Sequence, residues 1–187
     1  MIISVIGSGG KTTYIHELKD KYVSQGKTVL MCTTTHMLIE EDTLVNPSLD
    51  EIMHQIEKYG YCHAGNLCDD KKICALDLNL LNQLKKMVDV ILIEADGSKH
   101  LPLKYPNEKE PVIDLDSDEI VLISNLKGLG NPVKNVIHRY TLMDIDPNEL
   151  VTPKIMQDLI RVYLKKLDKP VKIHVNGDSN LYTRCLK

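Results

Sequence analysis

The chain has 187 residues, 26 acidic and 23 basic side chains, and a formal net charge of −3. This balance favours neither a nucleic-acid backbone nor an anionic membrane as the main partner, and the lack of Phe and Trp leaves few platforms for base stacking. No apolar run approaches the ~20 residues that span a bilayer, and Met1 leads into an apolar stretch without a signal-peptide pattern. We therefore expect a single α/β domain over residues 1–187 in the cytoplasm, with no nucleic-acid or membrane partner.

The first thirteen residues, MIISVIGSGGKTT, predict a buried strand, a glycine-rich turn and the start of a helix. The three glycines of the turn have no Cβ, so the backbone can adopt positive φ and direct its N–H groups toward one anion. A helix N-terminus also favours phosphate. The predicted nucleotide-binding residues are Gly7, Ser8, Gly9, Gly10, Lys11, Thr12 and Thr13.

The spacing Gly7-x-x-Gly10-Lys11-Thr12 is a short form of the P-loop pattern, whose usual form would place its first glycine at Val5. In this pattern Lys11 contacts the β- and γ-phosphates of ATP or GTP, and the Thr12 hydroxyl binds Mg²⁺. A Rossmann glycine motif is excluded because it needs glycine at position 12. The alternative is a glycine turn that joins a strand to a helix and binds nothing.

Residues 12–25 are predicted as a helix and 28–33 as a second buried strand, which together complete a right-handed β-α-β unit. A threonine cluster and a histidine follow at the carboxyl end of that strand, where open α/β sheets bind ligands. Thr34 is a candidate Mg²⁺ ligand, and Thr35 and His36 are candidate substrate contacts. Threonines that merely end a strand are an equally good interpretation.

Two short strands, 61–63 and 72–75, are predicted around a polar turn that spans 66–71. This segment contains Cys62, Cys68 and Cys74. Their C-x5-C-x5-C spacing lacks the paired C-x2-C of structural zinc sites, so small buried side chains are favoured over a metal site.

The strand predicted at 88–93 ends in Glu94-Ala95-Asp96-Gly97, as a Walker B element does. In this interpretation Asp96 and Thr12 hold Mg²⁺, while Glu94 orients or deprotonates the nucleophile. Two acidic residues in an ordinary turn after a strand are the alternative.

A basic, proline-rich loop follows these carboxylates. Lys99, His100 and Lys104 are candidates for holding a phosphate or an anionic second substrate, and Arg139 could brace a phosphate. A solvated basic loop and a structural arginine are the competing interpretations.

The remaining predicted elements are helices at 50–58 and 76–87, strands at 119–124 and 171–175, and a helix that begins after an N-cap at Thr152. Asn176 follows the last strand in an Asn-Gly-Asp turn and is a candidate nucleotide-base contact, although a strand-ending turn is favoured. The expected architecture is a three-layer, P-loop NTPase-like α/β fold with a mainly parallel sheet flanked by helices.

The segments GSGGKTT, TTTHM, IEADGSKHLPLK, EPVI and GLGNPVKNVIHR together resemble the YqeC family, from Ile2 to about Arg139 and more faintly to Asp178. Members of this family are described as accessory proteins of selenium-dependent molybdenum hydroxylases and as selenium cofactor biosynthesis proteins. The resemblance implies a P-loop nucleotide-binding fold with Gly10, Lys11 and Thr12 at the phosphates and metal. It also implies that Glu94, Asp96 and Lys99 are active-site residues.

Three departures from the family pattern stand out. His100 occupies a position where arginine is expected, the Asn-Gly-Asp turn lacks the lysine of an N-K-x-D motif, and the chain is shorter than most members. These departures bear on base specificity and on the completeness of the carboxyl-terminal part.

The leading hypothesis is therefore an NTP-hydrolysing maturation factor that uses ATP or GTP with Mg²⁺. Its partner would be a molybdenum hydroxylase or a cofactor intermediate of one, and the sequence leaves a homodimer open. A nucleotide-dependent switch or chaperone with little turnover is one alternative. A Mur-like ATP-dependent ligase is another, suggested by the threonine cluster, but this length does not hold the further substrate domains of such ligases.

Overall fold

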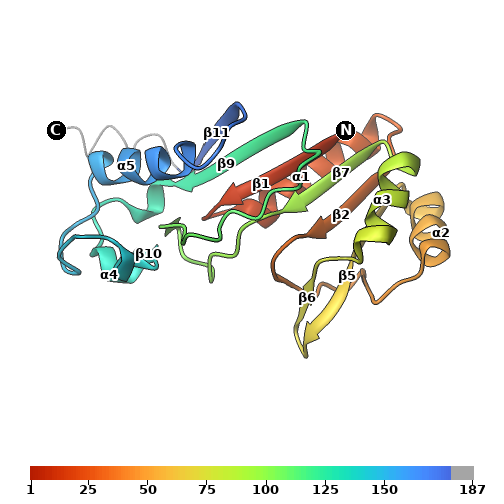
Figure 1. Ribbon diagram of the computed structural model, residues 1–187, viewed down its shortest axis with the longest axis horizontal. Coiled ribbons are helices and arrows are strands. Elements are labelled where there is room, and N and C mark those ends of the chain that lie inside the picture. Colours follow the sequence, from red (N-terminus) through yellow and green to blue (C-terminus); the bar gives the residue numbers. More distant parts are fainter. Residues whose placement is uncertain (178–187) are drawn as a thin grey trace. The chain divides into compact units, whose positions relative to one another are not determined.

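The computed structural model describes residues 1–177 and is shown in Figure 1. The chain divides into two compact units. Unit 1 contains Met1–Val5, Thr12–Gly97 and Val112–Glu119, and unit 2 contains Ile6–Lys11, Ser98–Pro111 and the chain from Ile120 onward. The single domain expected over the whole chain stays a prediction, and Asp178 lies outside the described residues.

Unit 1 is built on parallel strands, and no tight turn joins one of these strands directly to the next. β1 (Ile2–Gly7), β7 (Val90–Glu94), β2 (Val29–Thr33) and β5 (Tyr61–Asp69) follow one another in this order, and each neighbouring pair is parallel. Almost every residue of the first three strands is buried, as their continuous apolar sequences require. The central strands therefore form the core of unit 1.

Three short strands make this sheet mixed. β6 (Lys72–Cys74) pairs antiparallel with β5, and β3 (Met37–Leu38) pairs antiparallel with β6. β4 (Thr43–Val45) pairs parallel with β5. The prediction of a mainly parallel sheet is confirmed, with an antiparallel extension at β6 and β3.

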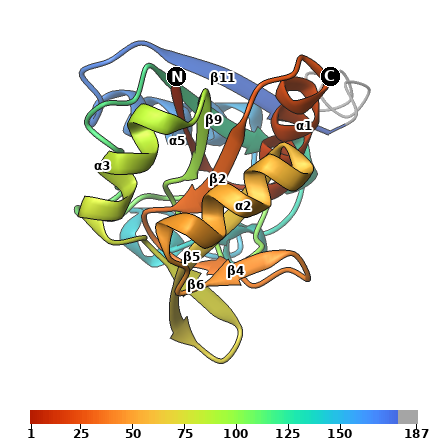
Figure 2. The same ribbon diagram turned by 90° about the vertical axis from the view of Figure 1, so that its right-hand side faces the viewer.

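Helices α1 (Lys11–Ser24), α2 (Leu49–Tyr59) and α3 (Leu78–Met87) connect the parallel strands. Figure 2 shows α3 on one side of the central strands and α1 and α2 on the other. Right-handed crossovers explain this, because α1 and α2 lead outward from β1 to β5, whereas α3 leads back to β7. Among the described residues, no helix combines the length and the apolar character needed to cross a membrane.

Unit 2 has two parallel strand pairs and a capped helix. β9 (Glu119–Asn125) pairs with β11 (Val171–Asn176), and β8 (Leu103–Lys104) pairs with β10 (Ile137–His138). Helix α5 (Pro153–Leu164) begins after Thr152, whose side chain accepts a hydrogen bond from Ile155 N.

Short helical segments complete unit 2: α4 (Val133–Val136) and the 3-10 turns Leu126–Gly128 and Tyr140–Leu142. The buried side chains of these elements form one apolar core with α5. This core consists of Leu103, Leu126, Leu129, Val133, Val136, Ile137, Val151, Ile155, Met156 and Leu159.

The long predicted elements are confirmed with boundary shifts of a few residues. The largest difference is β5, which extends through the predicted turn at 66–71 to Asp69, because residues 66–69 pair with β6. The α/β class with helices flanking the sheet is confirmed, and its P-loop NTPase-like identity stays a prediction.

Strand β7 carries Glu94 at its end, so the packing of β7 should matter for stability. Leu92 is fully buried, and Leu92→Ala is expected to lower the free energy of unfolding by about 2–5 kcal/mol by leaving a cavity. The control is Leu78→Ala on α3, whose side chain is 68% exposed, with an expected change within about 0.5 kcal/mol. Urea denaturation measures both, and equal losses would contradict the assignment of β7 to the core.

Candidate functional site

The loop from the end of β1 to the start of α1 has the conformation that the glycines predict. The φ angles are 84° at Gly7, 81° at Gly9 and 127° at Gly10, all in the region that side chains disfavour. Ser8 N donates a hydrogen bond to the Ile123 carbonyl at 3.0 Å. The loop is therefore tied to β9 by its backbone.

The glycines are also required by close packing within unit 2. A Cβ at position 7 would lie 2.1 Å from the Ile123 carbonyl oxygen, so no other residue fits there without movement. A Cβ at position 9 would lie 2.4 Å from Asn125 Cβ and 2.5 Å from the Pro102 carbonyl oxygen. The loop conformation is consequently set by its neighbours as well as by its own sequence.

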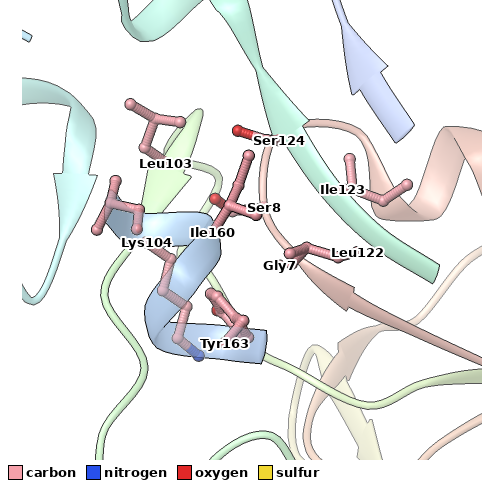
Figure 3. A pocket seen from close by; sticks show the side chains of 10 residues that line it. Gly7, Ser8, Leu103, Lys104, Leu122, Ile123, Ser124, Ile160 and Tyr163 are labelled. Carbon is pink, nitrogen blue, oxygen red and sulfur yellow. The ribbon is translucent and has the colours of Figure 1, made fainter. Parts of the chain in front are cut away.

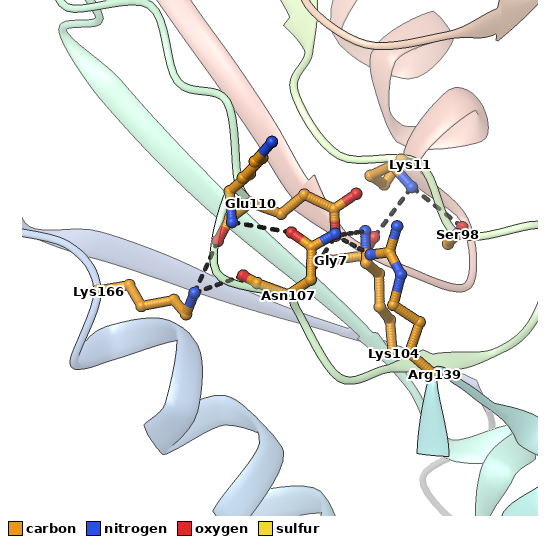
Figure 4. Close-up of polar contacts among 9 residues, drawn as sticks. Gly7, Lys11, Ser98, Lys104, Asn107, Glu110, Arg139 and Lys166 are labelled. Atoms are coloured by element: carbon orange, nitrogen blue, oxygen red, sulfur yellow. Dashed lines mark hydrogen bonds and ion pairs between the residues drawn. The ribbon is translucent and has the colours of Figure 1, made fainter. Parts of the chain in front are cut away.

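The Lys11 side chain lies back over this loop (Figure 4). Its Nζ donates to the Gly7 carbonyl at 2.9 Å and to Ser98 Oγ at 3.2 Å, and the residue is only 4% exposed. These contacts keep an ammonium group beside the glycine turn. An anion bound by the turn would meet this charge.

Two asparagine side chains also hold the loop. Asn125 Nδ2 donates to the Gly9 carbonyl at 2.7 Å, and Asn176 Nδ2 donates to the same oxygen at 3.0 Å. The Oδ1 of Asn176 is paired with His174 Nε2 at 2.8 Å. Asn176 thus lies against the predicted phosphate loop, where it supports the backbone.

In unit 1, the first turn of α1 meets the end of β7. Thr12 Oγ1 donates to Glu94 Oε2 at 3.1 Å, and Glu94 is 7% exposed. Asp96, two residues further along, is fully buried. The carboxylate that the Thr12 hydroxyl contacts is therefore that of Glu94, whereas the sequence had suggested Asp96 as its partner at a metal. Thr13 is exposed.

The threonine cluster at the end of β2 is held by backbone groups. Thr33 Oγ1 donates to the Glu94 carbonyl at 2.7 Å, and Thr35 N donates to Thr33 Oγ1 at 3.0 Å. Thr34 Oγ1 donates to the Val112 carbonyl at 2.5 Å. The bond from Thr33 connects the ends of β2 and β7, and the bond from Thr34 connects the end of β2 to the segment that begins at Val112. His36 is exposed.

Two basic residues of unit 2, Lys104 and Arg139, lie beside one carboxylate (Figure 4). Lys104 Nζ lies 2.8 Å from Glu110 Oε2, and Arg139 Nη1 contacts the same oxygen. Burial raises the pKa of Glu110, but the bonds from Arg139 and Lys104 outweigh it and hold that pKa below its usual value. Lys104 and Arg139 are therefore brought together by Glu110, as two cations around one anion.

Lys99 and His100 lie in the same basic loop and are exposed. Both have left-handed backbone conformations, with φ of 49° and 61°. His138, next to Arg139, has its pKa lowered to about 4 by burial first and then by the charges of Arg139 and Lys104. The imidazole of His138 is therefore neutral near pH 7.

A small pocket lies behind the loop in unit 2 (Figure 3). Its lining is mainly apolar, so it offers little to a phosphate. The lining residues are Gly7, Ser8, Leu103, Lys104, Leu122, Ile123, Ser124, Leu159, Ile160 and Tyr163.

Three residues of this region were missed by the sequence reasoning: Ser98, Glu110 and Asn125. Asn125 directly follows the strand predicted at 119–124, and an asparagine at that position carries no local signal for a contact with a distant loop. Glu110 is the first residue of the EPVI segment, which contributes to the family resemblance but predicts no role for this residue.

Comparison with known proteins gives a consistent result. The family model described as YqeC protein matches residues 3–141. The curated "Uncharacterized protein YqeC" of Escherichia coli (strain K12) is 30% identical over 148 residues, which cover 75% of this chain and 58% of the relative. The chain thus matches less than two thirds of that relative's length. No solved structure matches the chain.

The close approach at Gly7 can be measured by substitution. Gly26 has a similar φ of 73°, and a Cβ there would have nothing within 4 Å. Gly26→Ala should therefore lower the free energy of unfolding by about 1–2 kcal/mol, the cost of a left-handed conformation for alanine. Gly7→Ala should lower it by about 1–3 kcal/mol more, because the added Cβ meets the Ile123 carbonyl. Equal losses in urea denaturation would mean that the loop does not pack against β9.

The low pKa of His138 predicts a pH dependence. Its folded pKa of about 4 lies below the usual 6.5, so the unfolded chain binds the proton more readily. Its contribution to stability is complete above pH 6.5 and declines as the pH falls toward 4. His138→Gln should therefore show a smaller loss of stability between pH 7 and pH 5 than the wild type, by denaturation at each pH. An unchanged pH dependence would show that His138 is not desolvated.

Proposed function

The chain belongs to the YqeC family, and we propose that it binds a nucleoside triphosphate with Mg²⁺ through the loop and helix start at residues 7–13. The observation that carries the proposal is the hydrogen bond from Thr12 to Glu94 at 3.1 Å. A hydroxyl in the first turn of a helix, after a glycine loop and beside a strand-end carboxylate, is the ligand pair that P-loop enzymes use for Mg²⁺.

The phosphate part of the proposal rests on the loop of unit 2. Positive φ at the three glycines, the helix N-terminus that follows and the buried Lys11 ammonium all favour a bound anion. Because the loop is already held by Asn125 and Asn176, its donors would stabilise transferring phosphate charge without reorganisation.

The contact with Thr12 supports an exchange of the roles expected for the two carboxylates. We assign Glu94 to the Mg²⁺ ion with Thr12, and we assign Asp96 to orienting the attacking water or acceptor. Lys99 would stabilise the developing charge, and Lys104 with Arg139 would receive an anionic part of a second substrate, in exchange for one of their bonds to Glu110. Thr35, His36 and His100 are further candidates for substrate contacts.

For the cellular role, we propose an accessory function in the maturation of selenium-dependent molybdenum hydroxylases. Its support is the family resemblance. A P-loop NTPase that turns over would act as an energy-coupled maturation enzyme, whereas one that only binds would act as a nucleotide-dependent chaperone.

The experiment is calorimetric titration of ATP, GTP and their non-hydrolysable analogues, with and without Mg²⁺, together with phosphate-release assays. The variants are Lys11→Ala and Glu94→Gln, and the control is Lys21→Ala at an exposed position of the same helix. Lys11→Ala should reduce turnover by about 10²–10³-fold, as removal of one transition-state donor does. Glu94→Gln should bind nucleotide with an affinity that no longer depends on Mg²⁺.

Three other results are informative. If Lys11→Ala binds nucleotide with the affinity of the wild type in the calorimetric titration, the proposal is refuted. Tight binding without phosphate release would favour the chaperone. Whichever of ATP and GTP binds more tightly identifies the nucleotide base that the protein prefers.

A further inference from the structure

A group of side chains of the types that can bind a metal ion lies in unit 1, on segments that the nucleotide proposal does not use. Glu40 follows β3, Asp42 precedes β4, and His63 lies on β5. One ligand atom from each lies within 4.8 Å of the others. Glu40 Oε2 is 3.4 Å from His63 Nδ1 and 3.0 Å from Nε2 of His16 on α1.

The side chain of His63 is 0% exposed, and its Nε2 has no hydrogen-bond partner within the described part of the chain. A neutral imidazole carries a proton on one nitrogen and a lone pair on the other.

Neither tautomer of His63 satisfies both nitrogens. With the proton on Nδ1, the lone pair of Nε2 is buried without a donor. With the proton on Nε2, that N–H is buried without an acceptor, while the lone pair of Nδ1 faces the Thr43 hydroxyl, 2.9 Å away, and the Glu40 carboxylate. In this second tautomer Nδ1 can bind a cation, whose charge the Glu40 carboxylate would balance.

The surrounding contacts orient the carboxylates as supports of a metal site do. Tyr61 OH donates to Asp42 Oδ2 at 2.8 Å. Lys19 is the nearby cation, with its Nζ 4.5 Å from the Tyr61 ring, but it forms an ion pair with Asp20 at 2.7 Å. The group therefore gathers two carboxylates and two imidazoles.

We propose that Glu40, Asp42 and His63 bind a divalent first-row transition-metal ion of the Zn²⁺ type, with His16 positioning Glu40. An imidazole nitrogen favours such an ion over Mg²⁺ or Ca²⁺, which prefer oxygen ligands alone. Three protein ligands leave further coordination positions for water or another ligand. The ion joins β5, the segment after β3 and, through His16, helix α1.

The test uses the full chain, freed of metal by a chelator and titrated with Co²⁺ in excess Mg²⁺, so that oxygen-only sites are filled. Visible d–d absorption reports nitrogen and oxygen ligands, and calorimetry with Zn²⁺ gives the affinity. The wild type should bind one equivalent. Glu40→Gln and Asp42→Asn, which preserve shape, should bind more than about 100-fold more weakly, and His16→Gln about 10–100-fold more weakly.

The controls separate this site from others. His54→Gln and Asp69→Asn alter exposed residues outside the group and should bind like the wild type. Lys11→Ala should also bind Co²⁺ normally, so failure of the nucleotide proposal leaves this one intact.

Unchanged affinity in both Glu40→Gln and Asp42→Asn would overturn the proposal. It would equally be overturned by a near-ultraviolet thiolate band that disappears in Cys68→Ser or Cys74→Ser, since the ligands would then be cysteines.

Discussion

The loop that ends β1 depends on one close backbone approach. The Ser8 N–H donates to the Ile123 carbonyl at 3.0 Å, and the chain at position 7 lies so near that oxygen that only glycine fits. Gly7 also has a left-handed conformation, with φ of 84°, and the Gly9 carbonyl is held by Asn125 and Asn176. Because the loop is fixed by the ends of β9 and β11, its N–H groups have a set direction before any ligand binds.

In unit 1, the position of the Glu94 carboxylate depends on the register of the strands. The parallel pairing places Val5 of β1 and Thr33 of β2 opposite Glu94 on either side of β7. A slip of one residue would turn Glu94 to the other face of the sheet, away from Thr12. The buried apolar residues of β7 resist such a slip, so the position of Glu94 depends on the core as much as on its own contacts.

The sequence predicts the parts of this structure whose signals are local. Long apolar strands, amphipathic helices and the glycine loop have clear periodicity or backbone chemistry, and they were predicted with small boundary shifts. β3, β4, β8 and β10 have two or three residues each, too few to show a period, and they form only because a neighbour pairs with them. Glu110 and Asn125 matter through contacts with distant residues. The choice between Glu94 and Asp96 at Thr12 also lay beyond the sequence, since β7 ends at Glu94 and strand alternation no longer places Asp96.

Nucleotide binding by the glycine loop is measured most directly by the response of the loop amides to Mg²⁺ and nucleotide in a ¹H–¹⁵N NMR spectrum of the labelled chain. If the loop binds the phosphates, Mg·ATP or Mg·GTP shifts the amide resonances of Gly9, Gly10, Lys11 and Thr12 and leaves those of Gly60 and Gly130 in place. The two control glycines share the left-handed conformation but lie elsewhere in the fold, with φ of 79° and 72°. Loop resonances that stay unchanged at saturating nucleotide, with or without shifts elsewhere, would contradict nucleotide binding by the loop.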